Sequence, residues 1–158
     1  MGYDVAIRIA PLRDSRLVAH RLADNPRMLC ASPDYLQRFG TPQTLNDLHR
    51  HNCLRLSGVV QWSFIIDGHI SSLSVEGRFS GSNVEGVRTL CVAGSGIAQL
   101  SEWDTREELA AGTLVTIDLL DAQPQMLGVW ALFPTTRQLP ARVTVFLNAL
   151  KQAMEKNR

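Results

Sequence analysis

The chain has 158 residues, of which 45% are hydrophobic and 20% are charged, and 16 basic residues against 15 acidic ones give a formal net charge of +1. These values are typical of a globular protein with one domain or two small lobes, and they exclude a disordered chain. The near-neutral balance does not favour nucleic acid or an anionic membrane as a partner.

The three cysteines, Cys30, Cys53 and Cys91, lie in apolar segments. An odd number of such residues favours buried free thiols in a reducing compartment over disulfides, so we expect a cytoplasmic protein. The residues after Met1 lack the basic and apolar regions of a secretory signal, and no apolar run approaches the roughly 20 residues of a membrane span.

The first part of the chain is predicted to be rich in strands. The run 3–9 combines β-formers with almost continuous apolar residues, which predicts an interior strand buried on both faces and ended by Pro11. A second strand is expected over 17–22. Asp24-Asn25-Pro26 then breaks the chain before a strand over 28–31.

Capping signals mark three helices. Ser32, followed by a proline and an acidic residue, predicts a helix over 34–39, and Thr44 begins a short helix through residue 48. Ser82 and Glu85 have the spacing of a capping box, which predicts a helix that begins at Ser82. Gly94 is expected to end that helix in the left-handed conformation.

The remaining elements alternate between strands and helices. Asp67-Gly68 predicts a hairpin turn. Strands are predicted over 53–56, 62–66, 70–79, 97–100, 114–117 and 129–133, a short helix over 105–111, and a helix from Pro140 with an apolar stripe of Val143, Phe146, Leu147, Leu150 and Met154. This alternation predicts an α/β architecture, and breaks near 23–26 and 121–124 divide it, with the middle as one lobe and both ends as the other.

Several motifs have competing interpretations. Gly94-Ser95-Gly96 lies between a helix and a strand, the reverse of a phosphate-binding loop, so a helix stop is the better account. His49, His51 and Cys53 alternate, but their spacing matches no metal motif, and no nucleophile signature surrounds Cys53. We therefore expect no metal site, no cofactor and no catalytic residues.

Two positions favour ligand binding. Ser82 and Asn83 lie at a predicted helix start, where free N–H groups and the positive end of the helix dipole favour an anion such as a carboxylate. Arg8, near the end of a predicted strand, either pairs with Asp4 or Asp14 or binds a carboxylate bidentately in a cleft between lobes.

The order of these segments resembles the effector-binding (substrate-binding) domain of LysR-type transcriptional regulators. The resemblance rests on segments spread over nearly the whole chain: Tyr3-Asp4-Val5-Ala6-Ile7-Arg8-Ile9, Leu29-Cys30-Ala31-Ser32-Pro33-Asp34-Tyr35-Leu36, Gly40-Thr41-Pro42, Trp62-Ser63-Phe64, Ala93-Gly94-Ser95-Gly96-Ile97-Ala98, Glu108-Leu109-Ala110-Ala111-Gly112 and Leu139-Pro140-Ala141-Arg142-Val143. Each segment is weakly specific, and their combination is specific.

The resemblance implies a two-lobed fold like that of type 2 periplasmic binding proteins. It assigns 23–127 to a complete lobe two, and 1–22 with 128–158 to a partial lobe one. It also implies that the helix-turn-helix of such regulators lies outside this sequence, so that DNA would be reached only through that absent domain. We expect a homo-oligomer such as a dimer, with no membrane partner.

The family's effector contacts, carried over by position, fall at Arg8, Ile9, Ser57, Ser82, Asn83 and Phe133. The expected function is therefore to sense a small-molecule effector, a carboxylate or an aromatic compound, between the lobes. Alternatives are a transport-type solute-binding protein, a structural remnant without ligand binding, and a hydrolase that uses Cys53 with His49 or His51. Gln99 departs from the apolar residue usual in the family.

Overall fold

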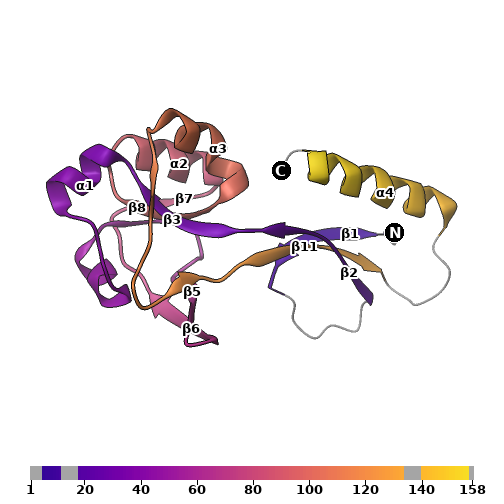
Figure 1. Cartoon of the computed structure of the whole chain (residues 1–158), viewed down its shortest axis with the longest axis horizontal. Coiled ribbons are helices and arrows are strands. Elements are labelled where there is room, and N and C mark those ends of the chain that lie inside the picture. Colours follow the sequence, from indigo (N-terminus) through magenta and orange to yellow (C-terminus); the bar gives the residue numbers. More distant parts are fainter. Residues whose placement is uncertain (1–4, 12–17, 134–139, 157–158) are drawn as a thin grey trace. The chain divides into compact units, whose positions relative to one another are not determined.

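The computed structural model describes residues 5–11, 18–133 and 140–156. The chain forms two compact units, which we call unit 1 (Met1–Asn25 with Met126–Arg158) and unit 2 (Pro26–Gln125). Both combine helices and sheets (Figure 1), so the predicted α/β class is confirmed. None of the described helices is long and apolar enough to cross a membrane.

Unit 2 is built on a mixed five-stranded sheet. Its strand order is β7 (Ser80–Gly81), β4 (Cys53–Leu56), β8 (Ile97–Ser101), β3 (Arg27–Ala31) and β9 (Val115–Ile117). β4 runs parallel to β7 and β8, whereas β3 runs antiparallel to β8 and β9. A smaller antiparallel sheet contains β10 (Gln123–Pro124), β5 (Gln61–Ile66) and β6 (His69–Ser74). The expected break at 121–124 thus includes a short strand, and the strand predicted over 70–79 ends at Ser74.

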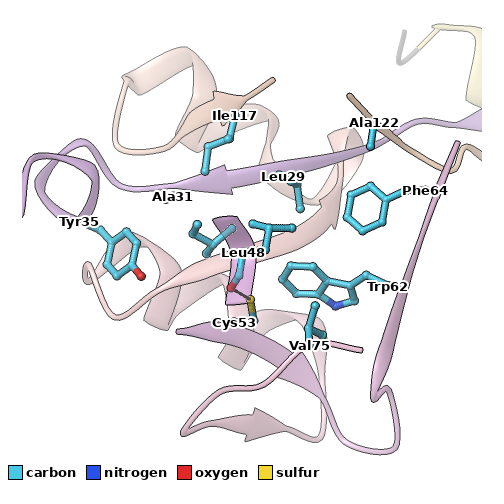
Figure 2. Close-up of a cluster of buried hydrophobic side chains, with 11 residues drawn as sticks. Leu29, Ala31, Tyr35, Leu48, Cys53, Trp62, Phe64, Val75, Ile117 and Ala122 are labelled. Carbon is cyan, nitrogen blue, oxygen red and sulfur yellow. Dashed lines mark hydrogen bonds between the residues drawn. The ribbon is translucent and has the colours of Figure 1, made fainter. Parts of the chain in front are cut away.

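The five-stranded sheet buries both of its faces. Leu29 and Cys53 face a cluster that contains Trp62 and Phe64 of β5 (Figure 2). Alternate residues of the sheet face the other way and form a second cluster with α2 (Val84–Val92). The strands contribute Cys30, Leu54 and Ala98 to this cluster, and the helix contributes Val87 and Cys91. Because side chains alternate along a strand, the near-continuous apolar runs in the sequence serve both clusters.

The β5–β6 hairpin turns at the predicted position. Asp67 and Gly68 have φ angles of 49° and 78°. Positive φ at both central residues is the requirement of a type I′ turn, which an Asp-Gly pair meets at low steric cost.

Two of the predicted caps are confirmed. Ser32 Oγ accepts a hydrogen bond from the Tyr35 N–H at 3.1 Å and begins α1 (Pro33–Phe39), which Gly40 ends at φ 83°. Thr44 and Asp47 form a capping box at the start of η1 (Leu45–Arg50), which is a 3₁₀-helix. Asp47 Oδ2 accepts the Thr44 N–H at 2.9 Å, which gives a partner to one of the donors that a helix start leaves unpaired.

The predicted capping box of α2 is wrong. The N-cap is Asn83, whose Oδ1 accepts the Gly86 N–H at 2.8 Å, and the helix begins at Val84. Glu85 does not reach back to Ser82, because it pairs with Arg88 at 2.6 Å. The predicted helix stop is confirmed, since Gly94 has a φ of 75°.

The next helix begins earlier than predicted. α3 (Glu102–Ala111) starts three residues ahead of the expected position because Ser101 is its N-cap and accepts the Asp104 N–H. Gly112 ends the helix in the left-handed conformation with φ 72°.

The start of β4 is a point of close packing. A Cβ on Gly77 would lie 2.0 Å from the carbonyl oxygen of Cys53, and a Cβ on Gly96 would lie 2.2 Å from that of Asn52. Both contacts are with backbone, which cannot swing aside as a side chain can. These two glycines therefore allow neighbouring segments to approach β4.

Unit 1 is an antiparallel three-stranded sheet with a helix on one face (Figure 1). The strand order is β1 (Ala6–Ala10), β11 (Leu127–Phe133) and β2 (Val18–Asn25). Val143 of α4 (Ala141–Lys156) is buried with Ala131 and Phe133 of β11, and Leu147 packs against them.

Two burial predictions in unit 1 are wrong. β1 is an edge strand among the described residues rather than an interior one, and its Ile7 and Ile9 are 41% and 52% exposed. The predicted apolar stripe of the last helix includes Phe146, but this side chain is 49% exposed because α4 turns Val143 and Leu147 toward the sheet.

Trp130 joins two strands of this sheet. Its ring lies against Gly128, where a Cβ would stand only 2.5 Å from Nε1, and that Nε1–H donates to the Ala10 carbonyl at 3.1 Å. The Arg21 guanidinium lies over the ring at 5.8 Å from its centroid. Gly128 is therefore needed for the ring to reach β1.

Candidate functional site

Three of the predicted effector contacts lie together at one edge of the five-stranded sheet. β4 and β7 are parallel and pair Leu56 with Gly81, and the Ser57 N–H donates to the Gly81 carbonyl at 2.8 Å. The residues that follow these strands therefore lie side by side. Ser57, Ser82 and Asn83 are all exposed there.

The two hydroxyl groups at this edge are available to a ligand. Within the described part of the chain, the side chains of Ser57 and Ser82 make no hydrogen bond. Asn83, in contrast, uses its Oδ1 to cap α2. The edge thus combines two hydroxyls with the positive end of a helix dipole, which together favour a small polar or anionic group.

An ion-pair network compensates the acidic residue at this helix start. Arg88 binds Glu85 at 2.6 Å, binds Glu108 of α3 at 3.2 Å, and donates to the Asp104 carbonyl at 2.8 Å. The pairing with Glu85 raises the pKa of Arg88. Because Glu85 is engaged by Arg88, its charge is offset where an anion would approach α2.

The other three predicted contacts belong to unit 1 and lie on opposite faces of its sheet. The register pairs Ile9 with Val129 and Arg8 with Trp130, so Arg8 faces away from Ile9 and from Phe133. The Phe133 ring is 2% exposed and meets His20 edge-on at 5.4 Å, on the face that α4 covers.

Arg8 itself is exposed on β1 and forms no ion pair with a described carboxylate. Its two expected acidic partners, Asp4 and Asp14, lie outside the described residues. The assignment of all six positions to an effector site stays a prediction.

Two of the residues considered for metal binding or nucleophilic catalysis, His51 and Cys53, make other contacts. Tyr35 Oη lies 3.0 Å from His51 Nδ1, and Cys53 is buried with its Sγ donating to the Leu48 carbonyl at 3.8 Å. No group of three His, Cys, Asp or Glu residues in the described ranges could hold a metal ion. Burial raises the pKa of Cys53 to about 12, which disfavours the nucleophilic thiolate.

The other two cysteines are also buried free thiols. Cys91 Sγ donates to the Cys30 carbonyl at 3.3 Å, and Cys30 Sγ donates to the Ala98 carbonyl at 3.8 Å. The hydrogen bond with Cys91, followed by burial, raises the pKa of Cys30. Both sulfurs therefore behave as small core groups.

Sequence reasoning missed two residues that organise unit 2. Asn52 uses both its backbone and its side chain to connect neighbouring segments. Arg27 is a largely buried cation in β3. The sequence did hold one signal for Arg27. It lies two residues before Leu29 of the strand predicted over 28–31, so both side chains are expected on the same face of the sheet.

Comparison with known proteins identifies the family. The model of the LysR substrate binding domain matches residues 1–155. The HTH-type transcriptional activator TtdR of Escherichia coli K12 is 35% identical over 150 residues, covering 90% of this chain and 47% of that protein. The HTH-type transcriptional regulator DmlR of the same strain is 34% identical over 157 residues, covering 96% of this chain and 50% of that protein.

Solved structures agree with this family and its fold. Full-length AphB of Vibrio cholerae matches with a TM-score of 0.76 and 31% identity over 92% of this chain and 50% of that one. The CrgA regulatory domain of Neisseria meningitidis matches with a TM-score of 0.75 and 29% identity over 95% of this chain and 74% of that one. The predicted periplasmic-binding-protein-like fold is thereby confirmed.

The chain spans about half the length of the curated relatives that it matches. Those relatives are transcriptional regulators, which are not enzymes. The chain belongs to the LysR family of transcriptional regulators and carries their effector-binding, or substrate-binding, domain.

Proposed function

We propose that this chain is the sensing part of a LysR-type regulator and that its effector is a small carboxylate or aromatic compound. The observation that carries the proposal is the family match over residues 1–155, and the exposed hydroxyls of Ser57 and Ser82 beside the start of α2 supply a suitable polar edge. Arg8, Ile9, Asn83 and Phe133 are the further proposed contacts.

We assign unit 1 to lobe one and unit 2 to lobe two of such a regulator. Contact with DNA is proposed to occur only through a helix-turn-helix domain, because the relatives are named HTH-type whereas residues 1–155 match the substrate-binding domain. We further propose that the protein is cytoplasmic and forms homo-oligomers.

The test is isothermal titration of the chain with small carboxylic acids and small aromatic compounds. Ser57→Ala and Ser82→Ala should each weaken binding, whereas Ser72→Ala, an exposed serine on β6, should not. Loss of a hydrogen bond to a neutral hydroxyl is worth about 1 kcal/mol, or roughly a fivefold change in Kd. Binding that is unaffected by both variants would contradict this site, and the absence of binding would favour a structural remnant.

A further inference from the structure

Arg27 is the first residue of β3, and the strand carries its side chain into unit 2. It pairs with Ser101 of β8 and shares a sheet face with Leu29, which is buried against Phe64 in the cluster of Figure 2. One of its terminal nitrogens, Nη2, donates to the Gln99 carbonyl at 2.8 Å. The guanidinium is therefore held at the margin of the core by one hydrogen bond.

No carboxylate in the described part of the chain forms an ion pair with Arg27, and its buried Nε has no acceptor there. Asp104 attracts the guanidinium by its charge without forming an ion pair with it, and its Oδ2 accepts the Ser101 hydroxyl at 2.7 Å. Burial accordingly lowers the pKa of Arg27, and Asp104 opposes that shift. Four other described arginines do have acidic partners, namely Arg21, Arg38, Arg50 and Arg88, whereas Arg55 of β4 shares with Arg27 a buried Nε that has no partner.

A largely buried cation without a counterion is unfavourable for stability. The residue as a whole keeps an intermediate exposure although its Nε is buried, and an anion would approach through the exposed part of the side chain. A guanidinium offers Nε–H and Nη–H groups in a fork that matches the two oxygens of a carboxylate. The missing partner is therefore expected to be an anion that accepts two parallel hydrogen bonds, as a carboxylate does.

Two polar residues of β8 share this sheet face with Arg27: Ser101, which lies opposite it and donates its hydroxyl to Asp104, and Gln99, which lies diagonal to it. Register pairs Gln99 with Leu29, so its side chain emerges beside that of Arg27, and its Nε2 donates to the Ser63 carbonyl at 3.4 Å. That contact leaves the Gln99 Oε1 as an acceptor for a hydroxyl or acid proton of a ligand. Gln99 is also the position at which the sequence departs from the usual apolar residue.

We propose that Arg27 binds the carboxylate of the effector, and that Gln99 beside it contacts a neighbouring polar group of the same small acid. The inference rests on the proposed function and narrows it, because it assigns the effector to the carboxylic acids and adds two residues that the resemblance did not supply. A neutral aromatic compound does not satisfy the unpaired Nε–H.

The experiment compares thermal unfolding and calorimetric titration of the full chain with acids and their uncharged amides. The probes are succinate and benzoate, succinamide and benzamide, and inorganic phosphate. The variants are Arg27→Met, Arg27→Lys and the control Arg106→Met, an exposed arginine on α3. We expect at least one acid to raise the Tm of the wild type and of Arg106→Met, with no effect of its amide.

Arg27→Met should weaken acid binding by about tenfold or more, as expected for loss of a charge-assisted bidentate contact, with Arg27→Lys in between. The Tm of Arg27→Met without ligand should equal or exceed that of the wild type, a result that a purely structural arginine would not give. A lower Tm of Arg27→Met without ligand would overturn the inference.

Equal acid binding by wild type and Arg27→Met would also overturn the inference. If the same acid responds to Ser57→Ala or Ser82→Ala, the proposed function still stands. Binding of the amides alone would overturn the inference and indicate an uncharged effector. Stronger binding of phosphate than of any carboxylic acid would overturn the assignment of the effector to the carboxylic acids.

Discussion

Asn52 joins four segments of unit 2 through one residue. Its N–H donates to Tyr35 Oη at 3.2 Å and its carbonyl accepts the Ile97 N–H at 2.9 Å. Its side chain accepts the Arg78 N–H at 2.8 Å and donates to the Ser95 carbonyl at 2.6 Å. The amide is suited to this position because it carries both an acceptor and a donor.

Asn52→Asp should therefore destabilise the protein. The substitution keeps the size of the side chain and its acceptor for Arg78, but it places a carboxylate oxygen against the Ser95 carbonyl. We expect a loss of about 1–3 kcal/mol in the free energy of unfolding, measured by urea denaturation. Asn46→Asp, at an exposed position of η1, is the matched control and should change it little. Equal stabilities of the two variants would contradict the role of Asn52.

His51 should make stability depend on pH. The Tyr35 hydroxyl accepts the Asn52 N–H and lies 3.0 Å from His51 Nδ1, to which it can donate its proton when the imidazole ring is neutral. Burial, followed by the charge of Arg50, lowers the pKa of His51 below its ordinary 6.5. Between the lowered pKa of His51 in the folded protein and the ordinary 6.5 in the unfolded chain, the unfolded chain binds more protons than the folded one. The free energy of unfolding therefore falls as the pH drops through 6.5.

The measurement is the free energy of unfolding between about pH 7.5 and about pH 5, the range in which histidine titrates. His51→Gln should flatten this dependence, because glutamine can accept the tyrosine proton without titrating. His69→Gln, on the exposed turn of the hairpin, should leave the dependence as in the wild type. A steeper fall in His51→Gln would contradict this assignment.

At the scale of residues, the N-cap of a helix could be predicted where the sequence offers one capping residue. It could not be predicted where two capping residues are adjacent. Ser32 had no competitor and was confirmed as a cap. Ser82 and Asn83 are neighbours with similar capping preference, and the spacing to Glu85 favoured the wrong one. The competing ion pair of Glu85 with Arg88 depends on contacts between helices that spacing alone does not reveal.

β1 shows the corresponding limit at the scale of elements. A short apolar run predicts a strand, but it does not establish how many neighbours the strand has. In the structure, β11 is the only described strand that pairs with β1, and Ile7 and Ile9 remain exposed. An apolar edge strand offers unpaired backbone groups to another chain.

We expect this chain to self-associate through β1. Antiparallel pairing of two copies about Ile7 places Ile9 opposite Val5 of the second copy and Arg8 opposite Ala6, so no like charges meet. Ile9→Lys should lower the mean mass in light scattering at high concentration, since charge protects edge strands. Val145→Lys alters a residue of α4 that is 69% exposed and should not lower it. A monomeric wild type, or equal effects of the two variants, would contradict this interface.

At the scale of the whole molecule, unit 2 is continuous in sequence whereas unit 1 is assembled from both ends of the chain. All buried residues of the two core clusters of unit 2 come from Pro26–Gln125. The boundaries expected near 23–26 and 121–124 rested on polar and proline residues, and the compact units part after Asn25 and after Gln125.

Residues 26–125 produced alone should therefore fold. We expect cooperative thermal unfolding by circular dichroism, with near-UV signals from Trp62 in its core. A fragment of residues 32–125 is the control, since it lacks β3, the strand between β8 and β9, and should not fold. Non-cooperative melting of the longer fragment would contradict the independence of unit 2.

The family and the order of its elements could be predicted because they follow from patterns spread over the whole chain. The effector contacts could not be derived in the same way. A ligand-binding arginine such as the proposed Arg27 looks like any strand residue until its missing counterion is seen. The opposite orientation of Arg8 and Phe133 likewise depends on strand register rather than on sequence position.

The packing of Trp130 on Gly128 also means that tryptophan fluorescence can be used to follow the sheet of unit 1. With Trp62→Phe and Trp103→Phe, the remaining indole would report on the end of β1 through its hydrogen bond to the Ala10 carbonyl. Departure of β1 would expose this N–H to water and move the fluorescence emission to longer wavelength. The same spectrum, recorded during self-association, would show whether β1 stays docked on its own sheet while it recruits a second copy.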